Sequence, residues 1–253
     1  MPNVLWRPIQ NNAIELLALV GGAVLWEVLG WGLGLPWLPP FSTVMAALVQ
    51  FVDSGVILSN MVVSLQGLVI GFSISLVVGL VVGALMGRYR RVEKALDIYV
   101  YALFIAPSII FAPIFFAIFG LSDAVRIAVI IIYSVFVIII NTATAIRTVD
   151  PALVEMARSF GSRERQIFFR ILLPASLPLV FAGIRLGMGR AVKGMINGEM
   201  VIAFFGLGAL AQRYGSQFEA PKVFAIAMVV LIIALVCNWI VQTLENSLTQ
   251  WAE

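Results

Sequence analysis

The residues with the greatest capacity for chemistry in this 253-residue sequence lie inside a hydrophobic segment, between residues 176 and 203. Charged and amide side chains are interspersed there with glycines in an otherwise apolar stretch. A charge inside a bilayer is costly, so such side chains usually face a bundle interior or a water-filled cavity and have partners. They are Arg185, Arg190, Lys193, Asn197 and Glu199.

Two interpretations of these polar residues remain open. In the first, the carboxylates of Glu199 and Glu27 neutralise two of the three cations, and the charges are structural. In the second, the segment contributes a net positive wall to a translocation path. The two are compatible, because a paired charge can also line a path.

The sequence lacks the residues that most catalytic sites need. There is no histidine, and the one cysteine, Cys237, lies in an apolar run, so Cys/His metal sites and Ser–His or Cys–His catalysis are excluded or lack partners. A P-loop needs Gly-x-x-x-x-Gly-Lys-Ser/Thr, and no lysine here sits in that frame. We therefore expect a chain that is not an enzyme, holds no metal or cofactor, and leaves any ATP hydrolysis to a partner.

Composition indicates a polytopic membrane protein. The sequence is 62% hydrophobic and 11% charged, with a mean hydropathy of +1.05. Six apolar segments are each about 20–28 residues long, enough to cross a hydrocarbon core of ~30 Å. We therefore expect an all-α fold of six transmembrane helices in a single domain, 1–253, within a lipid bilayer. The segments are 13–35, 61–87, 96–119, 124–143, 176–203 and 223–244.

Two of these segments carry further signals. The second has small residues at four-residue spacing, among them Gly71, Gly79 and Gly83, which let helices approach closely. They fit packing inside the chain or a seam between two chains, and we favour the first. The third contains Pro107 and Pro113, which free backbone carbonyls and are tolerated only where protein or a water-filled path surrounds them.

The distribution of Lys and Arg predicts the orientation. With the N-terminus in the cytoplasm, ten cations fall on the cytoplasmic side, three outside and three within the fifth segment. The positive-inside rule therefore predicts that both termini, and the loop of residues 150–174, are cytoplasmic. Because these cations lie beside membrane segments rather than in a basic tract, no nucleic-acid binding is expected.

Residues 150–174, DPALVEMARSFGSRERQIFFRILLP, predict two short amphipathic helices. Asp150 is a good N-cap, and Pro151 suits the first helical turn. Gly161 supplies the left-handed residue that ends the first helix, Ser162 caps the second, and Pro174 ends it. We interpret this 150–174 loop as a polar surface that a partner binds, with an ordinary interfacial hairpin as the alternative.

The spacing within this loop resembles the "EAA" loop of binding-protein-dependent ABC importer permeases. One departure is Met156, where the pattern usually has alanine. The resemblance implies that the loop forms coupling helices that dock in a groove of a separate ATPase subunit. The residues that carry it are Glu155, Met156, Ala157, Gly161, Ile171, Leu173 and Pro174.

Other stretches resemble the nitrate/sulfonate/taurine branch of these permeases. They are Trp26-Glu27, Ser64-Leu65, Pro107, residues 183–200 and residues 206–208. After the first span the branch has LPSP-like residues, whereas Leu38-Pro39-Pro40-Phe41 stands here. The resemblance covers nearly the whole chain.

This resemblance implies a fold, partners and a class of solute. The fold is that of a type I ABC importer permease, with the coupling loop between helices 4 and 5. The implied assembly lies in the bacterial inner membrane: two copies of the chain, two ATP-binding cassette subunits, and a periplasmic or lipid-anchored substrate-binding protein. The implied solute is an anion like nitrate, a sulfonate or taurine, although close relatives carry uncharged or cationic vitamins and their precursors.

Two further classes of function are weighed against this one. A stand-alone carrier with a repeated half and broken helices would show an internal repeat, and none is found. A membrane enzyme would need acids, nucleophiles or metal ligands grouped at one depth, and Glu27 and Glu199 have no evident catalytic partners.

The orientation is testable by labelling. A cysteine at Ser54 should react with an impermeant thiol reagent from the periplasm, and a cysteine at Ser162 only from the cytoplasm, because the cations place residues 150–174 inside. The opposite labelling pattern would contradict the six-span orientation and the role of the loop.

Overall fold

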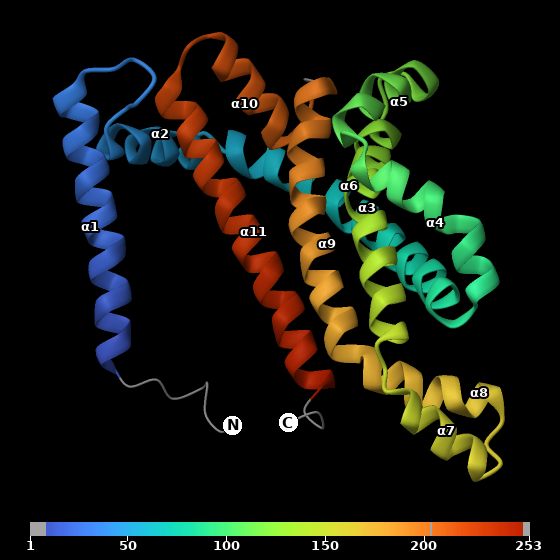
Figure 1. Cartoon of the computed structure of the whole chain (residues 1–253). Coiled ribbons are helices and arrows are strands. Elements are labelled where there is room, and N and C mark those ends of the chain that lie inside the picture. Colours follow the sequence, from blue (N-terminus) through green and yellow to red (C-terminus); the bar gives the residue numbers. More distant parts are fainter. Residues whose placement is uncertain (1–8, 203, 250–253) are drawn as a thin grey trace.

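The computed structural model describes residues 9–202 and 204–249, and this part of the chain is helical, with no strand. Figure 1 shows the long helices crossing the molecule between two ends, one of which carries α7 and α8. The elements are α1 (Ile9–Leu33), α2 (Phe41–Asp53), α3 (Val56–Arg88), α4 (Arg90–Ile105), the 3₁₀ turn η1 (Ser108–Ile110), α5 (Phe111–Phe119), α6 (Asp123–Arg147), α7 (Pro151–Ser159), α8 (Glu164–Ile167), the π-helical turn η2 (Phe168–Leu172), α9 (Leu173–Ile202), α10 (Gly206–Ser216) and α11 (Ala220–Leu248).

The long helices have the length and apolarity of membrane spans. Five helical stretches qualify, namely α1, α3, α6, the continuous run from α8 to α9, and α11. They coincide with the first, second, fourth, fifth and sixth apolar segments, although residue 203 at the end of the fifth lies outside the described residues. The expected all-α polytopic fold is confirmed.

The third segment is not the continuous helix that residues 96–119 predict. α4 and the stretch Ser108–Phe119 are bent by 88° relative to each other, and six spans result only when this bent pair counts as one. The cause is local. Ala106 is extended (φ −57°, ψ 136°), the conformation that a following proline imposes, and Pro107 itself has no N–H to donate.

Two shorter helices, α2 and α10, lie at the end of the molecule away from α7 and α8 (Figure 1). In the sequence, the stretch from about Ser42 to Asp53 predicts a short interfacial helix, and α2 is the helix found there, whereas no sequence pattern predicts α10. The start of α1 and the end of α11 lie at the same end as α7 and α8 (Figure 1). The chain ends themselves, residues 1–8 and 250–253, lie outside the described residues.

The core of the fold is α6 packed between α3 and α9. On the α3 side, a methyl group at Gly79 would lie 2.6 Å from Ile138 Cγ2, and one at Gly83 would lie 2.7 Å from the Ile139 carbonyl oxygen. On the α9 side, a methyl group at Gly187 would lie 2.6 Å from Ile138 Cγ1. Glycine is therefore needed for this close approach, and the small-residue face of the second segment packs inside the chain.

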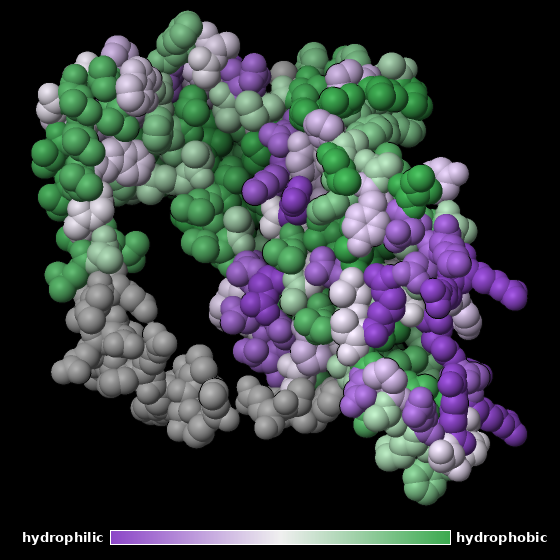
Figure 2. Space-filling view, viewed as in Figure 1, coloured by the Kyte–Doolittle hydropathy of each residue, from purple (hydrophilic) through white to green (hydrophobic). Residues whose placement is uncertain are grey.

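The surface divides along the length of the bundle. Figure 2 shows hydrophilic residues gathered around α7, α8 and the neighbouring part of α4, whereas the coloured part of α1, α5 and much of α11 are hydrophobic. Ion pairs Arg88–Glu164 and Arg147–Glu93 hold the ends of α3 and α6 at this hydrophilic end. Among the described residues, the cations that predict a cytoplasmic side, in residues 88–94 and 147–170, are thus gathered at one end.

Candidate functional site

The first half of the 150–174 loop forms as its sequence predicts. The Asp150 carboxylate accepts a hydrogen bond from the Ala152 N–H (2.9 Å), so it caps α7. At the other end the Ser162 N–H donates to the Ala157 carbonyl and the Gly161 N–H to the Arg158 carbonyl. This is a Schellman motif, and Gly161 has the left-handed φ of +74° that it requires.

The second half differs from the prediction at both ends. The N-cap of α8 is Arg163 rather than Ser162, and its N–H donates to the Gln166 side chain (2.8 Å). Pro174 does not end the helix, because α8 continues through η2 into α9. The π-helical turn explains this. The Leu173 N–H donates to the Phe168 carbonyl, five residues back, so the turn is wider than an α-helical one. The wider turn has room for the Pro174 ring, which would clash with the backbone of a regular α-helix.

The side chains of the loop fall into an inner and an outer set. Ala157, Ile167 and Leu172 are buried together and hold α7 against α8 and η2. Met156 and Phe160 face outward, 52% and 84% exposed, although they lie at the hydrophilic end of the molecule. Exposed apolar residues within a charged surface are typical of a protein-binding site.

The residues that resemble the EAA motif are divided in the same way. Glu155, Met156 and Gly161 are exposed, whereas Ala157 is buried and Ile171, Leu173 and Pro174 are partly buried. The first three therefore lie on the surface that a partner can reach, whereas Ala157 and Ile171 belong to the apolar cluster that holds the hairpin together.

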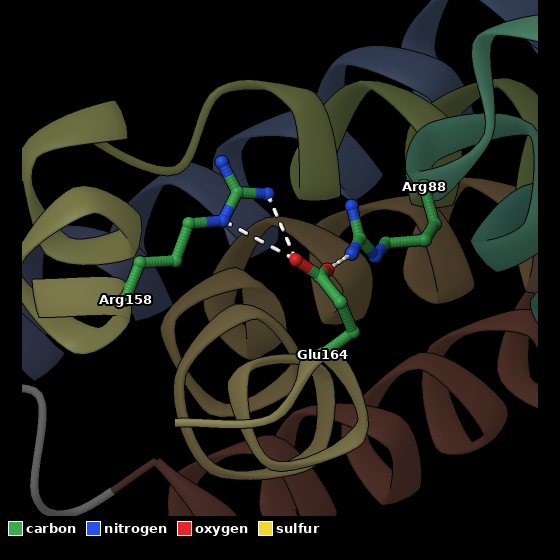
Figure 3. Close-up of polar contacts among 3 residues, drawn as sticks. All are labelled: Arg88, Arg158 and Glu164. Carbon is green, nitrogen blue, oxygen red and sulfur yellow. Dashed lines mark hydrogen bonds and ion pairs between the residues drawn. The ribbon is translucent and has the colours of Figure 1, made fainter. Parts of the chain in front are cut away.

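Glu164 is a polar residue of this loop that sequence reasoning missed. Its carboxylate pairs with Arg88 at the end of α3 and accepts hydrogen bonds from Arg158 of α7, at 3.2 Å from Nε and 3.1 Å from Nη2 (Figure 3). The sequence shows one acid among several cations here, which is a weak signal. The Arg88 partner comes from a distant helix, and only the fold brings the two together.

The five polar residues of α9 do not form one cluster. Arg185 pairs with Glu245 of α11, and Asn197 donates to the Tyr133 hydroxyl (2.9 Å). Arg190 and Lys193 are exposed and form no ion pair within the described part of the chain. The Arg190 guanidinium lies 5.7 Å from the centre of the Phe104 ring.

Glu199 is buried at the end of α9, with 1% of its surface exposed. Its Oε2 accepts hydrogen bonds from the Ser64 hydroxyl and from the Gly208 N–H, both at 2.9 Å. The Leu207 N–H donates to Ser64, so these side chains cap the first turn of α10. Gly206, at φ +89°, lies directly over the carboxylate, where a side chain would collide with it.

The carboxylate pairing considered for the α9 cations is therefore absent from the described residues. Glu199 binds Ser64 and the start of α10, while Glu27 accepts hydrogen bonds from the Ser42 N–H (2.8 Å) and hydroxyl (2.7 Å) at the start of α2. Both acids cap short helices, and the acid that does pair with α9 is Glu245. Within residues 9–202 and 204–249, no group of three metal-ligating side chains occurs.

Comparison with known proteins decides the family. Residues 75–250 match the family described as binding-protein-dependent transport system inner membrane component. The chain belongs to this family. It is thus an inner-membrane permease subunit of an ABC importer, as the loop and the fold together indicate.

Individual relatives carry different names. The chain is 30% identical to the formylaminopyrimidine transport permease protein ThiX of Halalkalibacterium halodurans, over 90% of this chain and 91% of that one. It is also 30% identical to the putative aliphatic sulfonates transport permease protein SsuC of Bacillus subtilis, over 90% and 83%. The riboflavin transport system permease protein RibX of Chloroflexus aurantiacus is 29% identical, over 96% and 91%.

A solved structure supports the fold. A chain of the MetNI methionine ABC transporter, from a study of its inward-facing conformations, superposes with a TM-score of 0.61 at 18% identity, over 81% of this chain and 97% of that one. At this identity the likeness concerns the fold, which is that of a type I ABC importer permease.

A substitution at Gly161 tests the role of the 150–174 loop. Gly161→Val should weaken binding of the ATPase subunit in a pull-down, because a β-branched residue strongly disfavours φ +74° and the Schellman motif fixes the hairpin. A methyl group at Gly161 meets no atom within 4 Å, so the effect comes from the backbone alone.

Gly161→Asn is the matched control, because asparagine tolerates the left-handed region at a cost far below that of valine. It should bind the ATPase nearly as the unaltered chain does, with membrane insertion unchanged in both variants. Undiminished recovery of the ATPase with the valine variant would refute the docking role.

Proposed function

We propose that this permease subunit forms the translocation path for a small anion like nitrate, a sulfonate or taurine. The observation that carries the proposal is the exposed pair Arg190 and Lys193, which lie near the middle of α9 without an ion-pair partner among the described residues. A Lys or Arg at the centre of a span costs about 2.5–3.5 kcal/mol on insertion scales, so these cations need a polar environment.

A second copy of the chain supplies that environment in our proposal. Two α9 faces brought together around an axis enclose a polar path and remove both cations from lipid. Within that path the cations attract an anion more strongly than in water, because the effective dielectric is lower. The resemblance to known permeases supports the same homodimer.

The two ends of the molecule differ in polarity, and each end is assigned a different partner. We propose that two ATPase subunits bind the 150–174 loops on the cytoplasmic side and supply ATP hydrolysis, since the sequence has no P-loop. A periplasmic or lipid-anchored binding protein delivers the solute at the end that carries α2 and α10. Both termini are then cytoplasmic, which agrees with the start of α1 and the end of α11 lying at the same end of the molecule as α7 and α8 (Figure 1).

An uncharged or cationic vitamin precursor is the second candidate solute. The observation that favours it is the 30% identity to a permease named for formylaminopyrimidine, which equals the identity to a permease named for aliphatic sulfonates. The exposed cations of α9 weigh toward the anion.

Arg190→Gln separates a path role from a structural one. The substitution removes the charge but keeps a hydrogen-bond donor on a shorter side chain, so it should lower uptake of nitrate, taurine or ethanesulfonate into proteoliposomes that hold the complete transporter. Because Arg190 has no ion-pair partner within the described residues, the yield of folded protein should be unchanged.

Arg185→Gln is the matched variant. It leaves Glu245, whose side chain is 16% exposed, without its cation, so it should lower the folded yield. Lost yield with Arg190→Gln would contradict the path role, and so would normal uptake of every anion tested.

A further inference from the structure

The 150–174 loop is joined to the membrane helices by the chain at both of its ends and by one ion pair. α6 leads into α7, and α8 leads through η2 into α9. The ion pair is that of Glu164 with Arg88 of α3, a helix distant in sequence. The junction with α9 is the obvious route for a movement of the loop, but its backbone is irregular.

The covalent junction with α9 has the features of a hinge. η2 is a π-helical turn within an otherwise α-helical run, a feature frequent at functional sites. Pro174 and Pro178 follow within the first turns of α9, and each lacks an N–H for the helical ladder. A helix with these interruptions bends more readily than a regular one, because fewer backbone hydrogen bonds hold its turns together.

The non-covalent junction centres on Glu164. Figure 3 shows its carboxylate between the guanidinium groups of Arg88 and Arg158, so that three side chains join α3, α7 and α8. Arg88 is in the last turn of α3, and its side chain is only 22% exposed. α3 itself is a regular helix of 33 residues without proline.

The energetics fit a positioning role better than a stabilising one. Glu164 is 58% exposed, and ion pairs at such sites contribute little to folding stability. A carboxylate shared by two guanidinium groups nevertheless fixes direction as well as distance, because each arginine presents its donors in a planar fork.

We propose that Glu164 is the positioning residue that makes the cytoplasmic end of α3 follow the 150–174 loop. The loop, α8 and the end of α3 move as one body when an ATPase displaces the loop, and η2 absorbs the change of angle toward α9. This inference rests on the proposed coupling to an ATPase, and it adds α3 as the helix that receives the movement.

Distances between spin labels test the proposal in the complete transporter. In a Cys237→Ser background, one label pair is placed at Leu85 and Arg163, and a second at Arg163 and Leu179, all exposed positions. Labelled chain is diluted with unlabelled chain so that distances within one copy dominate. Each pair is measured in nanodiscs without nucleotide and after trapping with ATP and vanadate.

The unaltered chain should keep the same Leu85–Arg163 distance in both states, while the Arg163–Leu179 distance shifts by about 2 Å or more. In Glu164→Gln and in Arg88→Gln, the Leu85–Arg163 distance should shift between the two states, because α3 no longer follows the loop. The matched control is Asp97→Asn on α4, whose carboxylate has no ion pair within the described residues, and it should behave as the unaltered chain.

Two results would overturn the proposal. One is a Leu85–Arg163 distance that shifts in the unaltered chain, and the other is a distance that stays fixed in Glu164→Gln and Arg88→Gln. Co-purification of the ATPase is scored separately. If the ATPase does not co-purify with the unaltered chain, the proposed coupling and this inference are both refuted. If it co-purifies normally but the distances give either of the two results above, only the role of Glu164 is refuted.

Discussion

The close approach of α6 to both α3 and α9 is the constraint on which the rest of this structure depends. In a bilayer, lipid is as apolar as the helix surfaces, so association rests on packing and hydrogen bonds rather than on hydrophobic burial. Glycines at 79, 83 and 187 remove the side chains that would hold the backbones apart. The Ser134 hydroxyl, which lies 2.8 Å from that of Ser75, adds a buried polar contact across one seam. The three helices thereby form one tightly packed unit, and the loop between α6 and α9 emerges from its end.

This arrangement explains how a hairpin too short to span a membrane can act on one. α7 follows directly from α6, and α8 leads into α9, so both ends of the 150–174 loop are attached to the tightly packed unit. The Schellman motif at Gly161 fixes the shape of the hairpin, while Met156 and Phe160 stay exposed for a partner. At the opposite end, Glu199 and Ser64 cap α10 and tie it to the ends of α9 and α3. The residues available for binding a partner thus lie at the ends of the helices, apart from the residues that pack the helices together.

The sequence predicts the periodic and local features of this fold well, and the long-range contacts poorly. Apolar segments, the Asp150 cap and the left-handed Gly161 follow from local physical rules, and the structure has all three. The wrong predictions concern prolines, side-chain partners and the cap at Ser162. Pro107 breaks the third apolar segment, which hydrophobicity predicts as one continuous helix. Pro174 is accommodated by a π-helical turn that the residue pattern does not predict. Glu164, Glu199 and Arg185 each have a partner from an element far away in the sequence. The polar residues that the sequence groups in one segment therefore have different neighbours in the fold.

The most direct test of the central constraint is the thermal unfolding midpoint of Gly83→Ala compared with that of Gly21→Ala, both purified in the same detergent. A methyl group at Gly83 meets the Ile139 carbonyl oxygen and Thr142 Cβ at 2.7 Å, whereas one at Gly21 on α1 meets no atom within 4 Å. Overpacking of this kind costs about 1–3 kcal/mol, so Gly83→Ala should unfold at a clearly lower temperature. Gly21→Ala should be neutral or slightly stabilising, because alanine is the better helix former by about 1 kcal/mol. An equal midpoint for the two variants would contradict the account, since α6 would then not depend on close approach to α3.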